Sequence, residues 1–306
     1  MSHLAVSADK RVAAIDVGTN TVLCLVAERR DGAFVVLEDM QAIPRLGRGV
    51  DGARMLQPAS MERAWEALED FARKARALGA KVIAVGTSAL RDATNRDIFV
   101  ERARRSCVRF DVISGQREAE LTFRGACHQL ASSEERVCVV DIGGGSTECV
   151  IGSASVIEAK WSLDVGSVRL FERHLKHDPP THAECDALMR DVLELLTPLP
   201  ASLPPIIACA GTATTVAGWL RGVPADEHHA LHGTAFDADT LRDAALRLAM
   251  MTTAARAQHA AIEPLRADVL AAGALLLASI AERSDERVRI STGGLRVGVA
   301  LEALDL

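Results

Sequence analysis

One strand-turn-strand segment occurs twice in this chain, and the repeat constrains the fold more than any other feature. Asp16-Val-Gly-Thr-Asn-Thr-Val-Leu-Cys-Leu-Val aligns without a gap on Asp141-Ile-Gly-Gly-Gly-Ser-Thr-Glu-Cys-Val-Ile, 125 residues further on. Solenoid and propeller repeats have periods of about 20 to 50 residues, so a repeat this long indicates duplication of a whole lobe. We therefore expect two similar lobes, each presenting one loop to a shared cleft.

The segments around the first copy predict an α/β lobe. Strands are expected at residues 12–16, 21–28 and 33–38, where β-branched runs are separated by hairpin signals. Further strands at 82–85 and 110–113 and helices at 59–78, 89–104 and 117–130 complete this half. We expect the helix at 117–130 to close the first lobe. A three-stranded meander followed by alternating strands and helices is typical of an α/β lobe.

The pattern starts again at residue 136, with strands at 137–141 and 147–152 around the second copy. Beyond residue 180 we expect helices at 181–197, 212–221, 238–258 and 265–283, strands at 205–210 and 287–290, and a last helix at about 294–306. These elements predict lobe I at residues 1–130 and lobe II at 131–306, with the last helix packing back on lobe I. A chain of 306 residues is long enough to form both cores.

Composition restricts the partners. A net charge of −6 argues against general nucleic-acid binding, which needs a basic surface, and 3% aromatic residues with no Tyr offer few platforms for base stacking. The seven cysteines form no C-x-x-C pair, so neither a zinc site nor a dithiol motif is indicated. Their odd number and the lack of a signal peptide favour a cytoplasmic location. The longest apolar stretch, 269–280, is too short to span a membrane.

The second copy of the loop, residues 141–148, carries more phosphate-binding chemistry than any other segment. Glycines place backbone N–H groups against a ligand without interference from a Cβ, and neighbouring hydroxyls add donors. These residues are Gly143, Gly144, Gly145, Ser146 and Thr147. Asp141 and Glu148, at the two ends, can hold a hard cation over the same loop. A plain tight hairpin would need fewer such groups, so we interpret the loop as a phosphate clamp.

Three further segments place polar groups directly after predicted strands. The first copy, residues 16–21, has one glycine and more hydroxyls, and its pairing with the second copy indicates a second phosphate clamp. Arg91 lies in the first turn of a helix, where an arginine opposes the helix dipole unless it faces an anion bound there. A solvated surface arginine is the alternative. Gly211 and Thr212 follow strand 205–210 and begin a helix, which makes a third seat for an anion.

Two carboxylates follow the strand that ends at residue 113, where a base facing the cleft would lie. They are Glu118 and Glu120. An acidic residue in the first turn of a helix also stabilises the helix dipole, so the position alone does not require chemistry. The residues by themselves do not decide between Glu118 and Glu120 as the base.

Taken in order, these segments resemble the exopolyphosphatase/guanosine-pentaphosphate phosphohydrolase family. The motifs that carry the resemblance are the Asp16 loop, Arg45-Leu-Gly-Arg-Gly, Ser88-Ala-Leu-Arg, Ile113-Ser-Gly with Glu118-Ala, residues 141–148, Leu163-Asp-Val-Gly, residues 211–215, Arg266-Ala-Asp and Gly293-Gly-Leu-Arg. The resemblance implies a two-lobed actin-like α/β fold, shared with sugar kinases and heat-shock chaperone ATPases, with duplicated lobes around a central cleft. Longer members carry an additional C-terminal helical domain. This chain ends at Leu306, and we expect the short form.

The resemblance also implies roles for single residues. Glu118 would be the catalytic base, and Asp141 and Glu148 would hold Mg²⁺, with Mn²⁺ as the alternative ion. The substrate-binding residues would be Asp16, Thr19, Asn20, Arg91, Gly143, Gly144, Gly145, Ser146, Gly211 and Thr212. The implied reaction is in-line attack of water on the terminal phosphorus of polyphosphate or guanosine pentaphosphate.

The chain departs from the family pattern at two positions. Arg117 replaces the first Glu of the family's Glu-Glu-Ala motif, and Arg48 stands where the family has Glu or a neutral residue. Both departures add positive charge. Together with Arg45 and Arg91 they predict a positive track through the cleft, which would favour polyphosphate over the nucleotide.

Two alternatives to a phosphohydrolase stay open at this point. One is a non-catalytic sensor that binds the alarmone or polyphosphate through the same loops, and the other is an actin-fold kinase. An intact Glu118 and both metal-binding carboxylates favour the enzyme, and no acceptor site for a kinase is evident. The sequence indicates neither nucleic-acid nor membrane partners and leaves a homodimer open.

Overall fold

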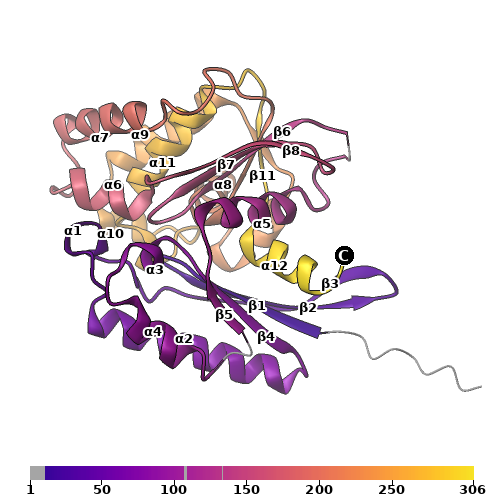
Figure 1. Ribbon diagram of the computed structural model, residues 1–306. Coiled ribbons are helices and arrows are strands. Elements are labelled where there is room, and N and C mark those ends of the chain that lie inside the picture. The colour runs from indigo at the N-terminus through magenta and orange to yellow at the C-terminus, as the bar shows by residue number, and fades with distance from the viewer. Residues whose placement is uncertain (1–10, 107–108, 133) are drawn as a thin grey trace, which may run out of the picture.

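The computed structural model describes residues 11–106, 109–132 and 134–306, which form two lobes, each built around one mixed sheet (Figure 1). The first sheet contains β1 (Arg11–Val17), β2 (Val22–Arg30), β3 (Ala33–Ala42), β4 (Lys81–Gly86) and β5 (Arg109–Val112). The second contains β6 (Val137–Ile142), β7 (Thr147–Gly152), β8 (Ile157–Leu163), β9 (Ile206–Cys209), β10 (Ala235–Phe236) and β11 (Val288–Ile290). The strand orders are β3-β2-β1-β4-β5 and β10-β11-β9-β6-β7-β8.

Helices connect and cover these strands. The α-helices are α1 (Val50–Ala53), α2 (Pro58–Ala77), α3 (Ser88–Asp92), α4 (Arg96–Ala103), α5 (Gly115–Cys127), α6 (Ser167–His174), α7 (His182–Leu195), α8 (Ala210–Arg221), α9 (Ala238–Ala249), α10 (Thr253–Ala257), α11 (Leu270–Ala281) and α12 (Leu295–Ala303), with 3₁₀ turns η1 (Ala225–Leu231) and η2 (Pro264–Arg266). No helix of the described ranges is long and apolar enough to cross a membrane.

The two lobes are built on the same plan. In the first, β1 pairs antiparallel with β2 and parallel with β4; in the second, β6 pairs antiparallel with β7 and parallel with β9. The turns agree in detail, because the Gly18 N–H donates to the Thr21 carbonyl and the Gly143 N–H donates to the Ser146 carbonyl, each at 3.0 Å. Both pairs are 125 residues apart. The two similar lobes predicted from the repeat are therefore confirmed, together with the actin-like fold that the family resemblance implied.

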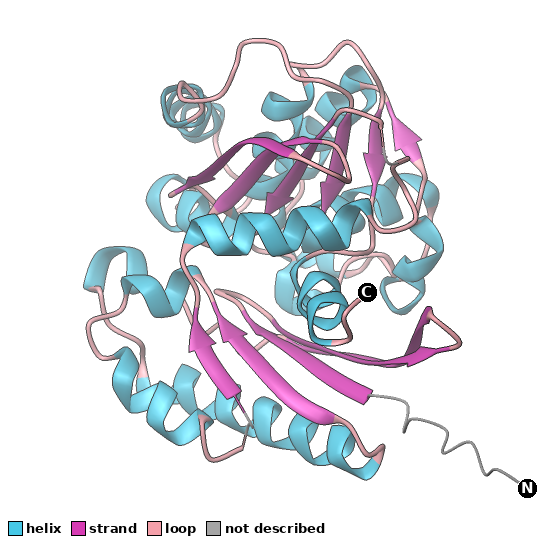
Figure 2. Ribbon diagram, turned by 45° about the vertical axis from the view of Figure 1, so that its right-hand side comes forward, coloured by secondary structure: helices cyan, strands magenta, loops and turns pink. Residues whose placement is uncertain are grey.

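Two helices lie between the sheets, and each covers the sheet of the other half of the chain (Figures 1 and 2). α5 follows β5, and we expected it to close the first lobe; instead its Ala119 and Phe123 pack against the second sheet. α12 comes from the end of the chain and packs its Leu295 and Val299 on the first sheet, against β1 and β2. This exchange places the start of α5, with Glu118, at the junction of the two lobes.

Three expected helices are interrupted. The helix expected at 89–104 breaks into α3 and α4, because the Asn95 side chain hydrogen-bonds both backbone groups of Leu56 instead of continuing the helix. The helix expected at 238–258 ends at Ala249, and Thr252 caps α10 by accepting from the Ala255 N–H. In the region expected to be helical at 265–283, Pro264 starts the 3₁₀ turn η2 and α11 begins only at Leu270.

Among the elements that were not anticipated, two border the second loop. β8 is a half-exposed strand whose polar and apolar residues give no strong run, and it forms the edge of the second sheet. α6 follows it immediately, and its first turn docks on the loop between β6 and β7. Because β8 and α6 were not expected, the sequence did not predict which residues surround the second loop.

Candidate active site

The glycine loop between β6 and β7 is held by its carbonyls. The Gly143 carbonyl accepts from the Ser167 N–H at 2.9 Å and the Gly144 carbonyl from the Val168 N–H at 2.8 Å, both in the first turn of α6. Arg169 Nε donates to the Gly145 carbonyl at 2.9 Å. Because the N–H of a planar trans peptide points opposite to its carbonyl, these bonds turn three successive N–H groups away from α6. None of those N–H groups, which belong to residues 144–146, donates to a described residue, so they form a nest for an anion.

The loop between β1 and β2 is tied down in the same way. The Thr19 carbonyl accepts from the Gly47 N–H at 2.7 Å, and the Asn20 carbonyl accepts from the Arg45 N–H at 3.0 Å. The two loops meet, since a Cβ added at Gly145 would lie 2.9 Å from Thr19 Oγ1. The same Cβ would lie 2.5 Å from Ser88 Oγ, so only glycine permits this approach. The structure thus brings both expected clamps together.

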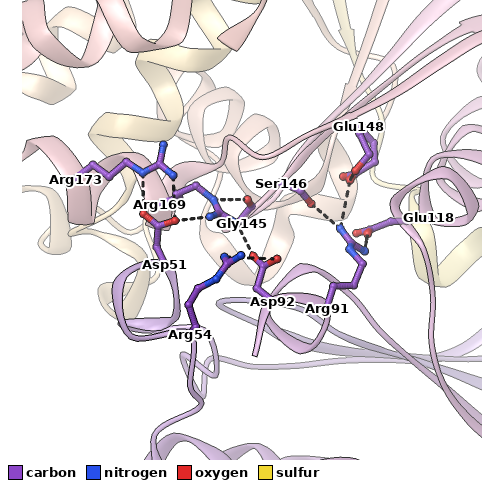
Figure 3. Close-up of polar contacts among 11 residues, drawn as sticks. Asp51, Arg54, Arg91, Asp92, Glu118, Gly145, Ser146, Glu148, Arg169 and Arg173 are labelled. Carbon is purple, nitrogen blue, oxygen red and sulfur yellow. Dashed lines mark hydrogen bonds and ion pairs between the residues drawn. The ribbon is translucent and has the colours of Figure 1, made fainter. Parts of the chain in front are cut away.

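Arg91 and Glu118 meet beside the glycine loop (Figure 3). Arg91 Nη1 donates to Glu118 Oε2 at 2.5 Å, while its Nη2 lies 3.4 Å from Ser146 Oγ and 3.9 Å from Glu148 Oε1. The Arg91 side chain is 21% exposed, so it is not the solvated surface arginine of the alternative interpretation. Of the two candidate bases, Glu118 faces this group, whereas Glu120 pairs with Arg117 and Lys160.

Four carboxylates, three of them buried and Asp16 half-buried, gather beside Arg91, and we call them the carboxylate cluster. They are Asp16, Glu118, Asp141 and Glu148. Asp141 and Glu148 lie opposite each other across the β6–β7 ladder. Burial, together with the charge on Glu118, raises the pKa of Asp141 to about 7 and that of Glu148 well above its usual value. Burial also raises the pKa of Glu118, although Arg91 opposes the shift.

A divalent cation fits this cluster. Arg91 lies among the four carboxylates, Arg296 also acts on Asp16, and the buried Oδ1 of Asp16 has no hydrogen-bond partner among the described residues. Among the described residues, no three His, Cys, Asp or Glu side chains are close enough to enclose an ion by themselves. Mg²⁺ is usually held by one or two carboxylates, with phosphate oxygens and waters as its other ligands. The chemistry of Asp141 and Glu148 therefore suits Mg²⁺ bound together with a phosphorylated ligand.

The third expected anion seat lies at the start of α8. Thr212 Oγ1 donates to the Ile142 carbonyl at 3.3 Å, which ties this turn to the end of β6. A Cβ added at Gly211 would lie 1.6 Å from Arg266 Nη1, so the glycine makes room for that guanidinium. Arg266 Nη2 reaches Thr21 Oγ1 of the first loop at 3.2 Å. Gly211 and Thr212 thus lie at the edge of the site, where Arg266 connects the start of α8 to the first loop.

Of the four arginines expected to form a positive track, Arg91 lies in the carboxylate cluster, Arg45 and Arg48 line the crevice beside Asn20, and Arg117 lies elsewhere. Arg117 donates to Glu302 Oε1 at 2.5 Å and to Glu120 at 3.2 Å, on the outer side of α5. Arg45 pairs with Asp268 at 3.0 Å and donates to the Leu265 carbonyl at 2.7 Å. Arg48 is exposed. Carboxylates elsewhere in the molecule therefore neutralise Arg45 and Arg117.

Sequence reasoning missed two arginines at the site, the half-buried Arg266 and the buried Arg169. Burial lowers the pKa of Arg266 to about 10, and its hydrogen-bond partners, Thr21 and Gln41, are both neutral. Arg266 lies in a motif that supported the family resemblance, which was a usable signal. Arg169 holds the glycine loop and is 6% exposed. Its signal was weaker, because it belongs to a helix that was not expected.

Two narrow crevices lie between the lobes. One, beside Thr19 and Gly145, has a volume of about 10 Å³. The other, beside Asn20 and Arg48, has a volume of about 20 Å³. Each has room for about one water molecule. Neither crevice is wide enough for a phosphate chain as the lobes stand in this structure.

Comparison with known proteins agrees with this fold. The family model described as the Ppx/GppA phosphatase family matches residues 25–306. Exopolyphosphatase 2 of Mycobacterium tuberculosis is 39% identical over 296 residues, which cover 92% of each chain. The guanosine-5'-triphosphate,3'-diphosphate pyrophosphatase of Vibrio atlanticus is 36% identical over 208 residues, 67% of this chain and 42% of that protein. The structure of an exopolyphosphatase from Cytophaga hutchinsonii superposes with a TM-score of 0.88 at 28% identity, over 97% of this chain and 98% of that one.

Proposed function

The chain belongs to the Ppx/GppA phosphatase family, and we propose that it releases terminal phosphate from inorganic polyphosphate by attack of water on phosphorus. The observation that carries the proposal is the meeting of three features at one point: a buried carboxylate on Arg91, an anion nest and the paired carboxylates Asp141 and Glu148. A base, a phosphate seat and a cation seat are the parts that hydrolysis of a phosphoanhydride requires.

Glu118 is proposed as the general base. Burial raises the pKa of Glu118, which makes its carboxylate a stronger base, while the adjacent Arg91 opposes the shift by favouring the charged form. Glu118 would orient the attacking water and accept its proton. The N–H groups of residues 144–146 would stabilise the charge that develops on the phosphoryl oxygens. Asp141 and Glu148 would hold Mg²⁺, or alternatively Mn²⁺, which when bound neutralises charge on the phosphate oxygens.

Polyphosphate is proposed as the principal substrate because the exopolyphosphatase relative matches over almost its whole length. Guanosine pentaphosphate is the second candidate, since a relative named for that activity is 36% identical over part of its chain. Both substrates end in a phosphoanhydride that the same loops can bind. They differ in what lies beyond it.

The test measures phosphate release from long-chain polyphosphate, guanosine pentaphosphate and ATP in the presence of Mg²⁺. Glu118→Gln keeps the size of the side chain but removes the base, and it should lower kcat by about 10²- to 10⁴-fold. Glu120→Gln is the matched control on the same helix and should retain activity, because Glu120 points away from the cluster. No release from any substrate above the Glu118→Gln background would refute the proposal. Loss of activity in Glu120→Gln alone would move the base to Glu120.

A further inference from the structure

Arg169 joins the glycine loop to two elements of the opposite lobe (Figure 3). From α6 its Nε donates to the Gly145 carbonyl at 2.9 Å. Its two terminal nitrogens donate to Asp51 of α1 and, at 2.6 Å, to Asp92 of α3. All three donor groups of one guanidinium are thereby used, and the side chain is only 6% exposed.

The planar guanidinium makes these contacts interdependent. Its nitrogens are fixed relative to one another, so Nε reaches Gly145 along a direction set by the two aspartates. Asp51 is itself held by Arg173 at 2.7 Å, and hydrogen bonding and charge from the two arginines hold the pKa of Asp51 below its usual value in spite of burial. Asp51 therefore presents a fixed, charged anchor on lobe I, and Asp92 accepts a further hydrogen bond from Arg169 beside it.

Two adjacent residues of α3 are linked to the Gly145–Ser146 segment, one through Arg169 and the other at the Ser146 side chain. Asp92 acts on the Gly145 carbonyl through Arg169, and Arg91 lies 3.4 Å from the Ser146 hydroxyl. The N–H of the Gly145–Ser146 peptide is one of the three nest donors, and it points opposite to the carbonyl that Arg169 holds. The direction of this donor thus depends on how α3 of lobe I sits against lobe II.

We propose that Arg169 is a positioning residue that couples closure of the two lobes to the orientation of the Gly145–Ser146 peptide. The inference rests on the proposed function of this loop as a phosphate seat. When the lobes separate, Arg169 loses both aspartates and no longer fixes the Gly145 carbonyl. When they close on a ligand, the same contacts return and aim the Ser146 N–H at the phosphoryl group. The catalytic arrangement is complete only in the closed state.

The kinetic test compares Arg169→Met with Arg173→Met. Both substitutions remove a guanidinium from Asp51, but only the first removes the contact with Gly145, which makes the second a matched control. Loss of one preorganised donor costs about 10²- to 10³-fold in kcat. Arg169→Met should therefore lower kcat on polyphosphate by about 100-fold with a smaller change in KM, and Arg173→Met should stay within about threefold. Arg169→Lys, with one nitrogen in place of three, should lose at least about tenfold.

A purely structural role would give a different result. If Arg169→Met keeps kcat within about threefold of the wild type at an equal folded fraction, or if Arg173→Met loses as much, Arg169 does not position the loop. If Arg169→Met does not fold, Arg169→Lys takes its place in both measurements, and its full activity would refute the coupling.

Hydrogen exchange gives a readout that does not need a substrate. Backbone amides of residues 143–147 and of residues 50–54 lie in different lobes, and Arg169 connects them. Arg169→Met should speed exchange in both segments, while Arg173→Met should speed it only in 50–54. Unchanged exchange at 143–147 in Arg169→Met would overturn the coupling. Absence of phosphate release by the wild type would count against the proposed function instead, so the two failures are distinguishable.

Discussion

Arg117 and Glu118 are neighbours in the chain but point to different sides of α5. Successive residues on a helix are rotated by about 100°, so adjacent side chains do not share a face. Glu118 is turned into the carboxylate cluster and Arg117 toward Glu302 of α12. The charge of Arg117 therefore stabilises the contact between α5 and α12 and does not act on the substrate.

Arg117→Glu is accordingly predicted to act on stability and not on substrate choice. It would place a third acidic group beside Glu120 and Glu302. The Arg117 side chain is 40% exposed, so the lost pairs are worth about 1 kcal/mol or less, with some added repulsion. Urea unfolding should show a lower free energy of unfolding, while kcat/KM for polyphosphate and guanosine pentaphosphate changes by the same small factor. If kcat/KM fell for polyphosphate alone, Arg117 would have to contact the substrate, contrary to this prediction.

The carboxylate cluster predicts stabilisation by Mg²⁺. Neutralising mutually repelling buried carboxylates favours the folded state, and a ligand at about 100 times its Kd adds about 2.7 kcal/mol. Millimolar Mg²⁺ should raise Tm relative to excess chelator, and Asp141→Asn combined with Glu148→Gln should abolish the shift. Asp191→Asn, at a carboxylate outside the cluster, is the control. An equal Tm in chelator and in Mg²⁺ would contradict a cation site here.

At the scale of elements, the contact between α5 and α12 depends on the absence of side chains. A Cβ at Gly298 would lie 1.8 Å from the Leu121 carbonyl, and one at Gly125 would lie 2.1 Å from the Gly294 carbonyl. The clashing atoms belong to helix backbones, so the helices would have to move apart. Because α5 carries Glu118, such a shift would also displace the proposed base.

Gly298→Ala is therefore predicted to lower both stability and activity. Overpacking of this kind typically costs about 1–3 kcal/mol, whereas Ala in place of Gly at an unhindered helical position stabilises by up to about 1 kcal/mol. Gly52→Ala in α1 is a control, since a Cβ there meets nothing within 4 Å. Thermal unfolding and kcat should both fall for Gly298→Ala. A stability equal to the wild type would show that the two helices are not packed this closely.

The elements of the two sheets were largely predictable from the sequence because the signals are local. β1 and β6 are apolar runs that end at turn residues, and the repeat relates one lobe to the other without any knowledge of packing. The exchange of α5 and α12 between the lobes was not predictable in full, because an amphipathic helix does not specify which sheet it covers. The role of Arg169 depends on a contact from α6 across the cleft, which no local pattern contains.

At the scale of the whole molecule, a chain of net charge −6 is proposed to bind a polyanion. Long-range repulsion opposes this association, so local cations must attract the substrate. Three of the candidate arginines already form ion pairs within the protein. These pairs are Arg91 with Glu118, Arg45 with Asp268, and Arg117 with Glu302. Arg48 differs from them. It is exposed, has no ion pair with any described residue, and lines the crevice that begins at Asn20 of the first loop.

This distribution of charge limits the preference for polyphosphate to a modest, salt-dependent effect. A phosphate chain that continues from the loops along the second crevice would reach Arg48, and an exposed contact of this kind is worth up to about 1 kcal/mol, or about fivefold in affinity. We predict a higher kcat/KM for long-chain polyphosphate than for guanosine pentaphosphate, with a ratio that shrinks as salt screens the contact. Arg48→Gln should raise the KM for polyphosphate by up to about fivefold at low ionic strength and leave the nucleotide nearly unchanged. Arg117→Gln, an equal loss of charge outside the crevice, should leave the ratio of the two substrates as it is. If the ratio of kcat/KM for the two substrates does not depend on salt, or changes equally in both variants, Arg48 does not favour polyphosphate over the nucleotide.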